Sequence, residues 1–137
     1  MPDRYTYPGS DVLVNKFGVT GYDDRKDAEV DFIGARMGAL REHPILGGYD
    51  LAHLQAIHAY LTQDMYSWGG EIRDTDTHPG GTGIAHCRPQ FIVPEAERIF
   101  GILAGSNWLR ALDADEFSEG LAWVWGETTT GVCALSG

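Results

Sequence analysis

Residues 66–84, which read YSWGGEIRDTDTHPGGTGI, form the most distinctive stretch of the chain. The stretch opens with two bulky aromatic residues, Tyr66 and Trp68, and places a Pro-Gly-Gly turn between two short runs, 73–77 and 82–85. Glycine accepts positive φ without a Cβ clash, and a preceding proline presets the bend. The stretch therefore predicts a small exposed β-hairpin or a protruding loop. An isolated two-stranded hairpin is marginal in water, so it must lean on the rest of the chain.

The rest of the chain shows helical periodicity. Helices are predicted from about Asp24 to His43, from Asp50 onward, over about 91–103, and from near Asp113 or Asp115 to near Glu127. Asp23 or Asp24 can cap the first helix and Asp50 the second, while residues 105–107 end the third. We expect four or five helices and one hairpin, and residues 11–18 as a short helical turn or an extended piece. The positions predicted to face inward are Ala28, Phe32, Ile33, Met37 and Leu40; Leu51, Leu54, Ile57, His58 and Leu61; Ile92, Ala96, Ile99, Phe100 and Leu103; and Phe117, Leu121, Ala122, Val124 and Trp125.

The size and charge of the chain limit its partners. With 137 residues and no internal repeat, it suits one compact domain with a modest core. Twenty acidic residues against ten basic ones give a net charge of -10, which argues against nucleic acid because phosphate would be repelled. No run has the length of a signal peptide or a membrane span, so we expect a cytoplasmic protein, with secretion by a dedicated machine as the alternative. Cys87 and Cys133 lack metal-type spacing, which favours free thiols over a disulfide or ligand role.

The residue pattern alone predicts no catalytic residue and no metal site. It contains no metal cluster, no nucleophile elbow and no glycine-rich phosphate loop followed by lysine. His58 is interpreted as a buried or half-buried histidine bonded to a neighbouring backbone carbonyl rather than as a catalytic base, because no carboxylate or cysteine lies at a helical spacing that would activate it. Lys16 is either a solvated lysine or a phosphate contact. The hairpin edge offers unpaired backbone groups to which an extended peptide could add as a strand.

The order of several motifs resembles the front half of Fic-domain proteins. The matching segments include YPGSDVLVNKFG at 7–18, DMYSWGGEIR at 64–73, Phe91-Ile92, and Leu121-Ala122-Trp123 ahead of Glu127. Asp50 with Leu54, Ile57 and His58 fits as well, and the likeness covers roughly residues 5–127. The resemblance implies a compact, mainly α Fic-like fold with a small β-hairpin flap. It also implies transfer of AMP from ATP to a hydroxyl side chain of a target protein.

The resemblance further assigns roles to particular residues. It places Lys16 and Phe17 near the nucleotide, which would be ATP with Mg2+. The flap would align the target protein's backbone beside the active site, and an inhibitory, antitoxin-like partner is a further implied partner. The flap residues implied to bind the target are Asp76, Thr77, His78, Gly80, Gly81, Thr82 and Ile84.

The family's defining signature is missing from this sequence. That signature reads His-Pro-Phe, any residue, Asp or Glu, then Gly-Asn-Gly-Arg; its histidine is the base, its acidic residue holds magnesium, and its end forms a phosphate nest. TGVCALSG stands at 130–137 instead. We therefore expect a Fic-like domain over 1–127 that lacks its C-terminal part, an aberrant tail over 128–137, and a truncated or frame-shifted, inactive chain. Smaller departures are Pro79 where lysine is common, Thr62 where phenylalanine is common, and Ile84 in place of an aromatic.

Three hypotheses remain open. The first is an adenylyltransferase domain that is inactive because its catalytic motif is absent. The second is a non-catalytic peptide-binding remnant that uses the hairpin edge, with a partner completing its core. The third is a poorly folding product in which Trp68, Phe100, Trp123 and Trp125 are left partly uncovered.

Overall fold

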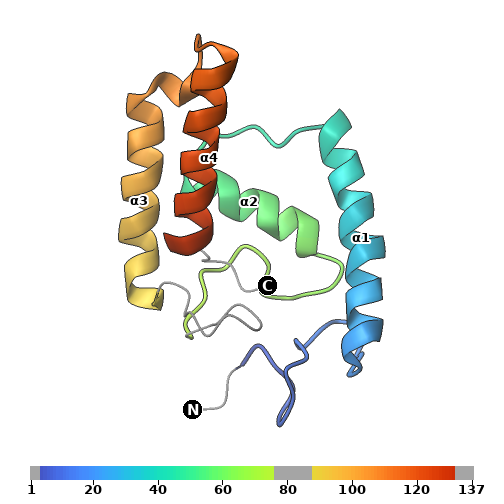
Figure 1. Ribbon diagram of the computed structural model, residues 1–137. Helices are drawn as coiled ribbons and strands as arrows, with labels where there is room; N and C mark the ends of the chain where they lie inside the picture. The colour runs from blue at the N-terminus through green and yellow to red at the C-terminus, as the bar shows by residue number, and fades with distance from the viewer. Residues whose placement is uncertain (1–3, 76–87, 132–137) are drawn as a thin grey trace. The chain divides into compact units, whose positions relative to one another are not determined.

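The computed structural model describes residues 4–75 and 88–131, with side chains described as far as residue 128. These residues form four α-helices and a short 3-10 turn (Figure 1). The mainly α fold predicted from the sequence is confirmed. The predicted hairpin falls largely on residues 76–87, outside the described part, so it stays a prediction. The elements are α1 (Tyr22–Glu42), α2 (Leu51–Thr62), α3 (Pro89–Gly105), η1 (Asn107–Leu109) and α4 (Ala114–Gly131).

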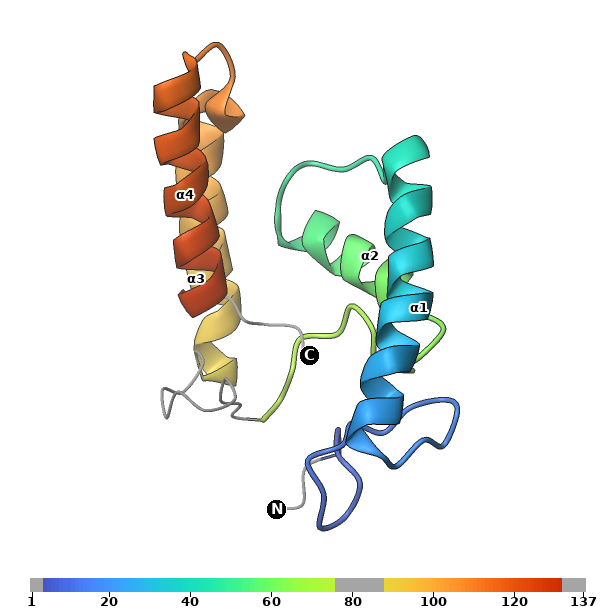
Figure 2. The ribbon, with the colours of Figure 1, turned by 45° about the vertical axis from the view of Figure 1, so that its right-hand side comes forward.

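The chain divides into two compact units, each with its own buried core. Unit 1 comprises Met1–Leu46 and His53–Glu71, and unit 2 comprises Gly47–Ala52 and Ile72–Gly137. Within unit 2, helices α3 and α4 lie side by side in both views (Figures 1 and 2). No helix in the described part of the chain is long and apolar enough to cross a membrane.

Unit 1 begins with an extended ribbon rather than a helical turn. Thr6 and Leu13 form an antiparallel bridge, and the Tyr7 N–H donates to the Val12 carbonyl at 2.9 Å. Gly9 turns the ribbon with φ of +70°, a backbone conformation that side chains with a Cβ rarely adopt. The extended alternative for this segment is therefore the right one.

The core of unit 1 is built on aromatic rings. Tyr5, Met65, Tyr66 and Trp68 are buried together, with Leu13 and Ala28 packed against them. The Trp68 ring stacks on Tyr66 at 4.5 Å and meets Tyr5 edge-on at 5.5 Å. Trp68 is only 6% exposed, so the expectation that it is left uncovered was wrong. The rings of Tyr5 and Tyr66 cover Trp68, in place of the further helix that we expected to cover it.

Helix α1 differs from its prediction at its start and on its inner face. It follows Gly21 rather than Asp23 or Asp24, and the Gly21 carbonyl accepts the Arg25 N–H at 3.0 Å. Those two aspartates lie in the first turn, where carboxylates stabilise the positive end of the helix. The helix ends at Glu42, as predicted. Phe32 and Met37 were predicted to face inward, but both are exposed. Polar contacts from Arg36 to Asp64 and from Arg25 to Tyr66 hold α1 to the rest of unit 1, in place of a continuous apolar stripe.

The core of unit 2 lies on α3, largely as predicted. Ile92, Ala96 and Ile99 are fully buried, with Leu51, Ile72 and Phe100 packed against them. Pro89 takes the first position of α3, where a missing N–H costs nothing, so Pro94 lies inside the helix and not in its first turn.

A left-handed turn connects α3 to α4. Asn107, Trp108 and Leu109 have φ of +54°, +52° and +60°, which is costly for residues with a Cβ. Leu109 packs against α4 at Gly120, where an added Cβ would lie 2.7 Å from a Leu109 methyl group. Asp113 then caps α4, accepting the Glu116 N–H at 2.8 Å.

Helix α4 is longer and less covered than predicted. It runs through the threonines to Gly131, so the prediction of an end near Glu127 was wrong. Threonine costs only a few tenths of a kcal/mol more than the better helix formers, too little to stop a helix that is already formed. Four residues predicted to face inward are exposed: Phe117, Leu121, Ala122 and Trp125. Trp123 is exposed too, as expected for an edge position.

Candidate functional site

The Asn-Lys-Phe-Gly segment at residues 15–18 forms a loop held by its own asparagine. The buried Asn15 amide donates to the Leu13 carbonyl at 3.0 Å and to the Val19 carbonyl at 2.7 Å. Its Oδ1 accepts the Val19 N–H at 3.0 Å, so one side chain closes the loop on both sides. Gly18 provides the left-handed turn with φ of +66°. This bonding fixes the positions of the two residues at the tip, Lys16 and Phe17.

Lys16 attaches the loop to the segment that follows α2. Its backbone N–H donates to the Met65 carbonyl at 2.7 Å, and its ammonium donates to the Gln63 carbonyl at 2.7 Å. The residue is exposed, and an ammonium group has three N–H donors. The bond to Gln63 leaves two of them, so the same ammonium can reach an anion.

Phe17 lies beside Lys16 as an exposed ring. It is 50% exposed and stacks on Phe32 of α1, with ring centres 4.9 Å apart and an interplanar angle of 26°. Stacking of this kind orders a surface ring that would otherwise rotate freely. Lys16 and Phe17 thus lie on a fixed loop, and their place beside a nucleotide stays a prediction.

Two polar contacts hold α1 against the same region. Arg36 donates to both carboxylate oxygens of Asp64, at 2.8 and 2.9 Å, a bidentate pair that lowers the pKa of Asp64. Deeper in unit 1, Arg25 and Tyr66 both donate to the Glu29 carboxylate. Burial, together with the bond to Glu29, raises the pKa of Tyr66 to about 12. The contacts of Asp64 with Arg36 and of Tyr66 with Glu29 were not predicted from the sequence, because 28 and 37 residues separate the partners along the chain.

His58 fixes the Gly69-Gly70 turn. Its Nδ1 accepts the Gly70 N–H at 2.9 Å, so Nδ1 carries no proton, and burial lowers the pKa of the ring. His58 is half-buried, which confirms the prediction of a buried or half-buried histidine, but its bond goes to an N–H and not to a carbonyl. Gln55 donates to the Gly70 carbonyl at 3.0 Å, and Gly70 has φ of +81°. The turn is thus bonded to α2 on both sides of its second glycine.

The residues before the predicted flap belong to unit 2. Arg73 is 1% exposed and donates to the Thr75 carbonyl at 2.7 Å. The flap residues Asp76, Thr77, His78, Gly80, Gly81, Thr82 and Ile84 lie outside the described residues, so their assignment stays a prediction.

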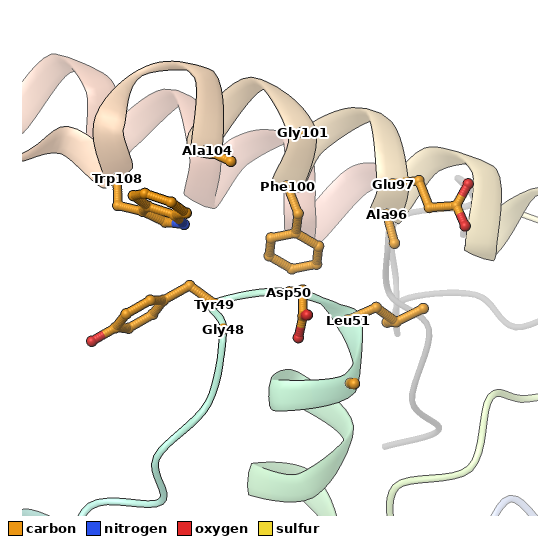
Figure 3. Close-up of a pocket in the computed structure, with 11 residues that line it drawn as sticks. Gly48, Tyr49, Asp50, Leu51, Ala96, Glu97, Phe100, Gly101, Ala104 and Trp108 are labelled. Atoms are coloured by element: carbon orange, nitrogen blue, oxygen red, sulfur yellow. The ribbon is translucent and has the colours of Figure 1, made fainter.

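Unit 2 contains a hollow that the sequence did not predict. It has a volume of about 480 Å³ and lies between residues 48–52 and α3. Figure 3 shows the rings of Phe100, Trp108 and Tyr49 around it, where Gly101 and Ala104 leave the surface of α3 open. The small residues Gly101 and Ala104, three residues apart on α3, are the sequence feature that could have indicated this hollow. The carboxylates of Asp50 and Glu97 also line the hollow.

Metal ligands do not come together in the part of the chain that the structure describes. No group of three His, Cys, Asp or Glu side chains lies close enough there to hold an ion. The two cysteines, Cys87 and Cys133, lie outside that part.

Comparison with known proteins finds relatives among adenylyltransferases. "Probable protein adenylyltransferase Fic" of Escherichia coli (strain K12) is 29% identical over 120 residues, 88% of this chain and 58% of that protein. "Probable protein adenylyltransferase y4lH" of Sinorhizobium fredii is 32% identical over 128 residues, 93% of this chain and 64% of that protein. The chain thus spans less than two thirds of either relative. No family model matches the sequence.

The fold is shared with solved Fic-domain structures. BepC of Bartonella tribocorum, a VirB-translocated effector protein solved with bound AMPPNP, superposes with a TM-score of 0.82 at 24% identity. The match covers 90% of this chain and 65% of BepC. At that identity the likeness establishes the fold.

Proposed function

The chain belongs to the Fic-domain family, and from that premise we propose that it carries the ATP-binding and target-binding part of a protein adenylyltransferase. In this reaction a hydroxyl oxygen of the target attacks the α-phosphorus of ATP. An oxygen–phosphorus bond forms, pyrophosphate leaves, and the hydroxyl proton passes to a base. Both relatives described above are named for this activity, and BepC binds an ATP analogue.

The fixed loop at residues 15–18 is the observation that carries the proposal. A chain with a net charge of -10 repels ATP at long range, so binding requires a cation placed locally. Lys16 provides one, and its bond to the Gln63 carbonyl holds the ammonium in place before any ligand arrives. Phe17 adds an exposed apolar ring beside it. A preorganised cation next to an aromatic ring suits a phosphate joined to a flat base.

The target protein is proposed to bind along residues 76–84. The support is the sequence pattern: a Pro-Gly-Gly turn flanked by short runs whose edges can bond an extended peptide. Main-chain bonds of this kind align a peptide without selecting its side chains. Selection of the hydroxyl to be modified then depends on where along the peptide it falls.

The transfer step itself requires groups that this sequence does not contain. The family's base, its magnesium-binding carboxylate and its phosphate nest all lie in the signature that is missing here. Loss of a general base alone lowers a rate by about a hundred- to ten-thousandfold. We therefore expect this chain on its own to bind ATP without transferring AMP at a measurable rate.

ATP binding can be tested by calorimetry on the intact chain and on Lys16→Ala. Lys26→Ala is the matched control, because it removes the same charge from an exposed site whose ammonium lies over the Tyr22 ring. We expect Lys16→Ala to weaken ATP binding at least about tenfold and Lys26→Ala to leave it within about twofold. Equal affinities for both variants would show that Lys16 is not a nucleotide contact.

The transfer and target-binding parts are tested separately. Labelled ATP incubated with the chain and a cell extract should yield no labelled protein; labelled product would contradict the expected lack of AMP transfer. An extended peptide from a modified target should slow amide hydrogen exchange over residues 76–84, while ATP alone leaves it unchanged. Protection by ATP but not by the peptide would refute the flap assignment.

A further inference from the structure

One side of α1 is not used by the fold of unit 1. Successive residues of an α-helix are rotated by about 100° around its axis. Eight exposed residues, Gly34 included, project from α1 within about 60° of the direction of Gly34. The opposite side carries Arg25, Ala28 and Arg36, which face the Tyr66 hydroxyl, the aromatic core and Asp64 respectively. We call the unused side the outer face of α1; its residues are Asp23, Asp27, Val30, Asp31, Gly34, Met37, Gly38 and Arg41.

The centre of the outer face is apolar and open. Val30 is 69% exposed and Met37 is 49% exposed, and seven residues separate them, so they lie on the same side two turns apart. A Cβ added at Gly34 or Gly38 would meet nothing within 4 Å. Glycine weakens a helix interior, and no contact within the described chain accounts for it at these two places. Because these two glycines have no side chains, the backbone of another helix can approach closely here.

The charges of the outer face are arranged about its midpoint. Asp23, Asp27 and Asp31 lie toward its amino-terminal end, and Arg41 lies at its carboxy-terminal end. Gly34 is seven residues from Asp27 and seven from Arg41. A second copy of α1 laid antiparallel across Gly34 therefore places each Arg41 opposite Asp27 of the other copy. The same placement puts each Met37 beside Val30 of the other copy, whereas a parallel arrangement would set aspartate against aspartate.

We infer that the outer face of α1 joins two copies of this chain in an antiparallel, two-fold symmetric contact. A two-fold contact uses the same patch on both copies and requires that patch to be self-complementary. The placement of Asp27 and Arg41 about Gly34 meets that requirement. A basic partner would gain from the aspartates but would be repelled by Arg41. One helix pair buries little surface, so the dimer is weak and forms at high protein concentration.

Charge reversal tests the pairing directly. Sedimentation over a range of protein concentrations gives the dimer dissociation constant for the full chain and its variants. We expect Asp27→Arg and Arg41→Glu each to raise the dissociation constant at least about tenfold, because each sets like charges opposite one another. The double variant exchanges the two charges and should return it to within about threefold of the parent. Glu119→Arg, on an exposed position of α4, makes the same change in net charge as Asp27→Arg and should not weaken the dimer.

A second variant separates loss of pairing from loss of folding. Gly34→Leu adds a bulky side chain at the centre of the contact but removes a helix-weakening glycine. It should abolish the dimer while the melting temperature of the dilute protein is unchanged or higher. The inference is overturned if the parent chain is monomeric at every concentration, if Gly34→Leu associates normally, or if the double charge reversal fails to restore the dimer.

Discussion

Replacing Gly70 by alanine should destabilise unit 1 far more than a glycine replacement usually does. Gly70 has φ of +81°, and a Cβ built there would lie 2.7 Å from the Gln55 carbonyl oxygen and 2.8 Å from the Ala59 Cβ. Ordinary contacts between such atoms are about 3.5 Å or longer. The crowded atoms belong to the backbone and the short side chains of α2, which cannot move aside as the end of a long side chain can.

The expected cost in unfolding free energy has three parts. Left-handed φ costs a residue with a Cβ about 1–2 kcal/mol. Overpacking against a fixed neighbour adds about 1–3 kcal/mol, and weakening the bonds from Gln55 and to His58 adds roughly 1 kcal/mol each. The sum is about 4–7 kcal/mol, against a total stability of about 5–15 kcal/mol for a typical domain.

Gly9→Ala is the matched control. Gly9 also has left-handed φ, at +70°, but a Cβ there meets nothing within 4 Å. Its replacement should cost only the backbone part, about 1–2 kcal/mol. Urea unfolding followed by circular dichroism measures both. If Gly70→Ala falls within about 0.5 kcal/mol of Gly9→Ala with an equal urea dependence, the close packing of the Gly69-Gly70 turn on α2 is wrong.

Three further predictions concern single contacts. A Cβ at Gly69 would overlap Thr62 Oγ1, so Gly69→Ala should be strongly destabilising in urea unfolding. Adding Thr62→Ala to that variant should recover about 1–3 kcal/mol of the loss, and strictly additive effects of the two substitutions would contradict the overlap. Burial lowers the pKa of His58, so the folded state favours the neutral ring. The contribution of His58 to stability is therefore full above about pH 6.5 and falls as the pH drops below that value. His58→Asn keeps a hydrogen-bond acceptor but does not titrate, so it should flatten this pH dependence in melting curves recorded at several pH values. Asp113→Ala should cost about 1 kcal/mol in thermal unfolding by removing the cap on the Glu116 N–H, and Asp113→Asn should restore most of it.

The sequence predicted the elements whose signals are local. The end of α1 before Pro44, the buried stripe on α3 and the start of α4 at Asp113 all follow from caps, prolines and apolar spacing. It could not predict the charged inner face of α1, because Arg36 and Asp64 are 28 residues apart and only the fold brings them together. Nor could it predict the left-handed turn at η1, where none of the residues is glycine.

The candidate site was named from the motif resemblance, and its role stays a prediction. The structure adds that Lys16 and Phe17 lie on a loop whose position is fixed by local hydrogen bonds and ring stacking. The bonds of Lys16 to Gln63 and Met65 could not be foreseen, since they join segments almost 50 residues apart. The hollow beside Phe100 was missed for a related reason: small residues in a helix do not reveal which segment lies opposite them.

Whether ATP binds at the Lys16 loop can be measured by titrating the isotope-labelled chain with ATP and following its amide chemical shifts. We expect saturable shifts that begin at residues 15–18 and the Gln63 and Met65 amides, and that disappear in Lys16→Ala but persist in Lys26→Ala. Saturable shifts centred on the hollow between residues 48–52 and α3, or none up to the highest ATP concentration, would contradict ATP binding at this loop.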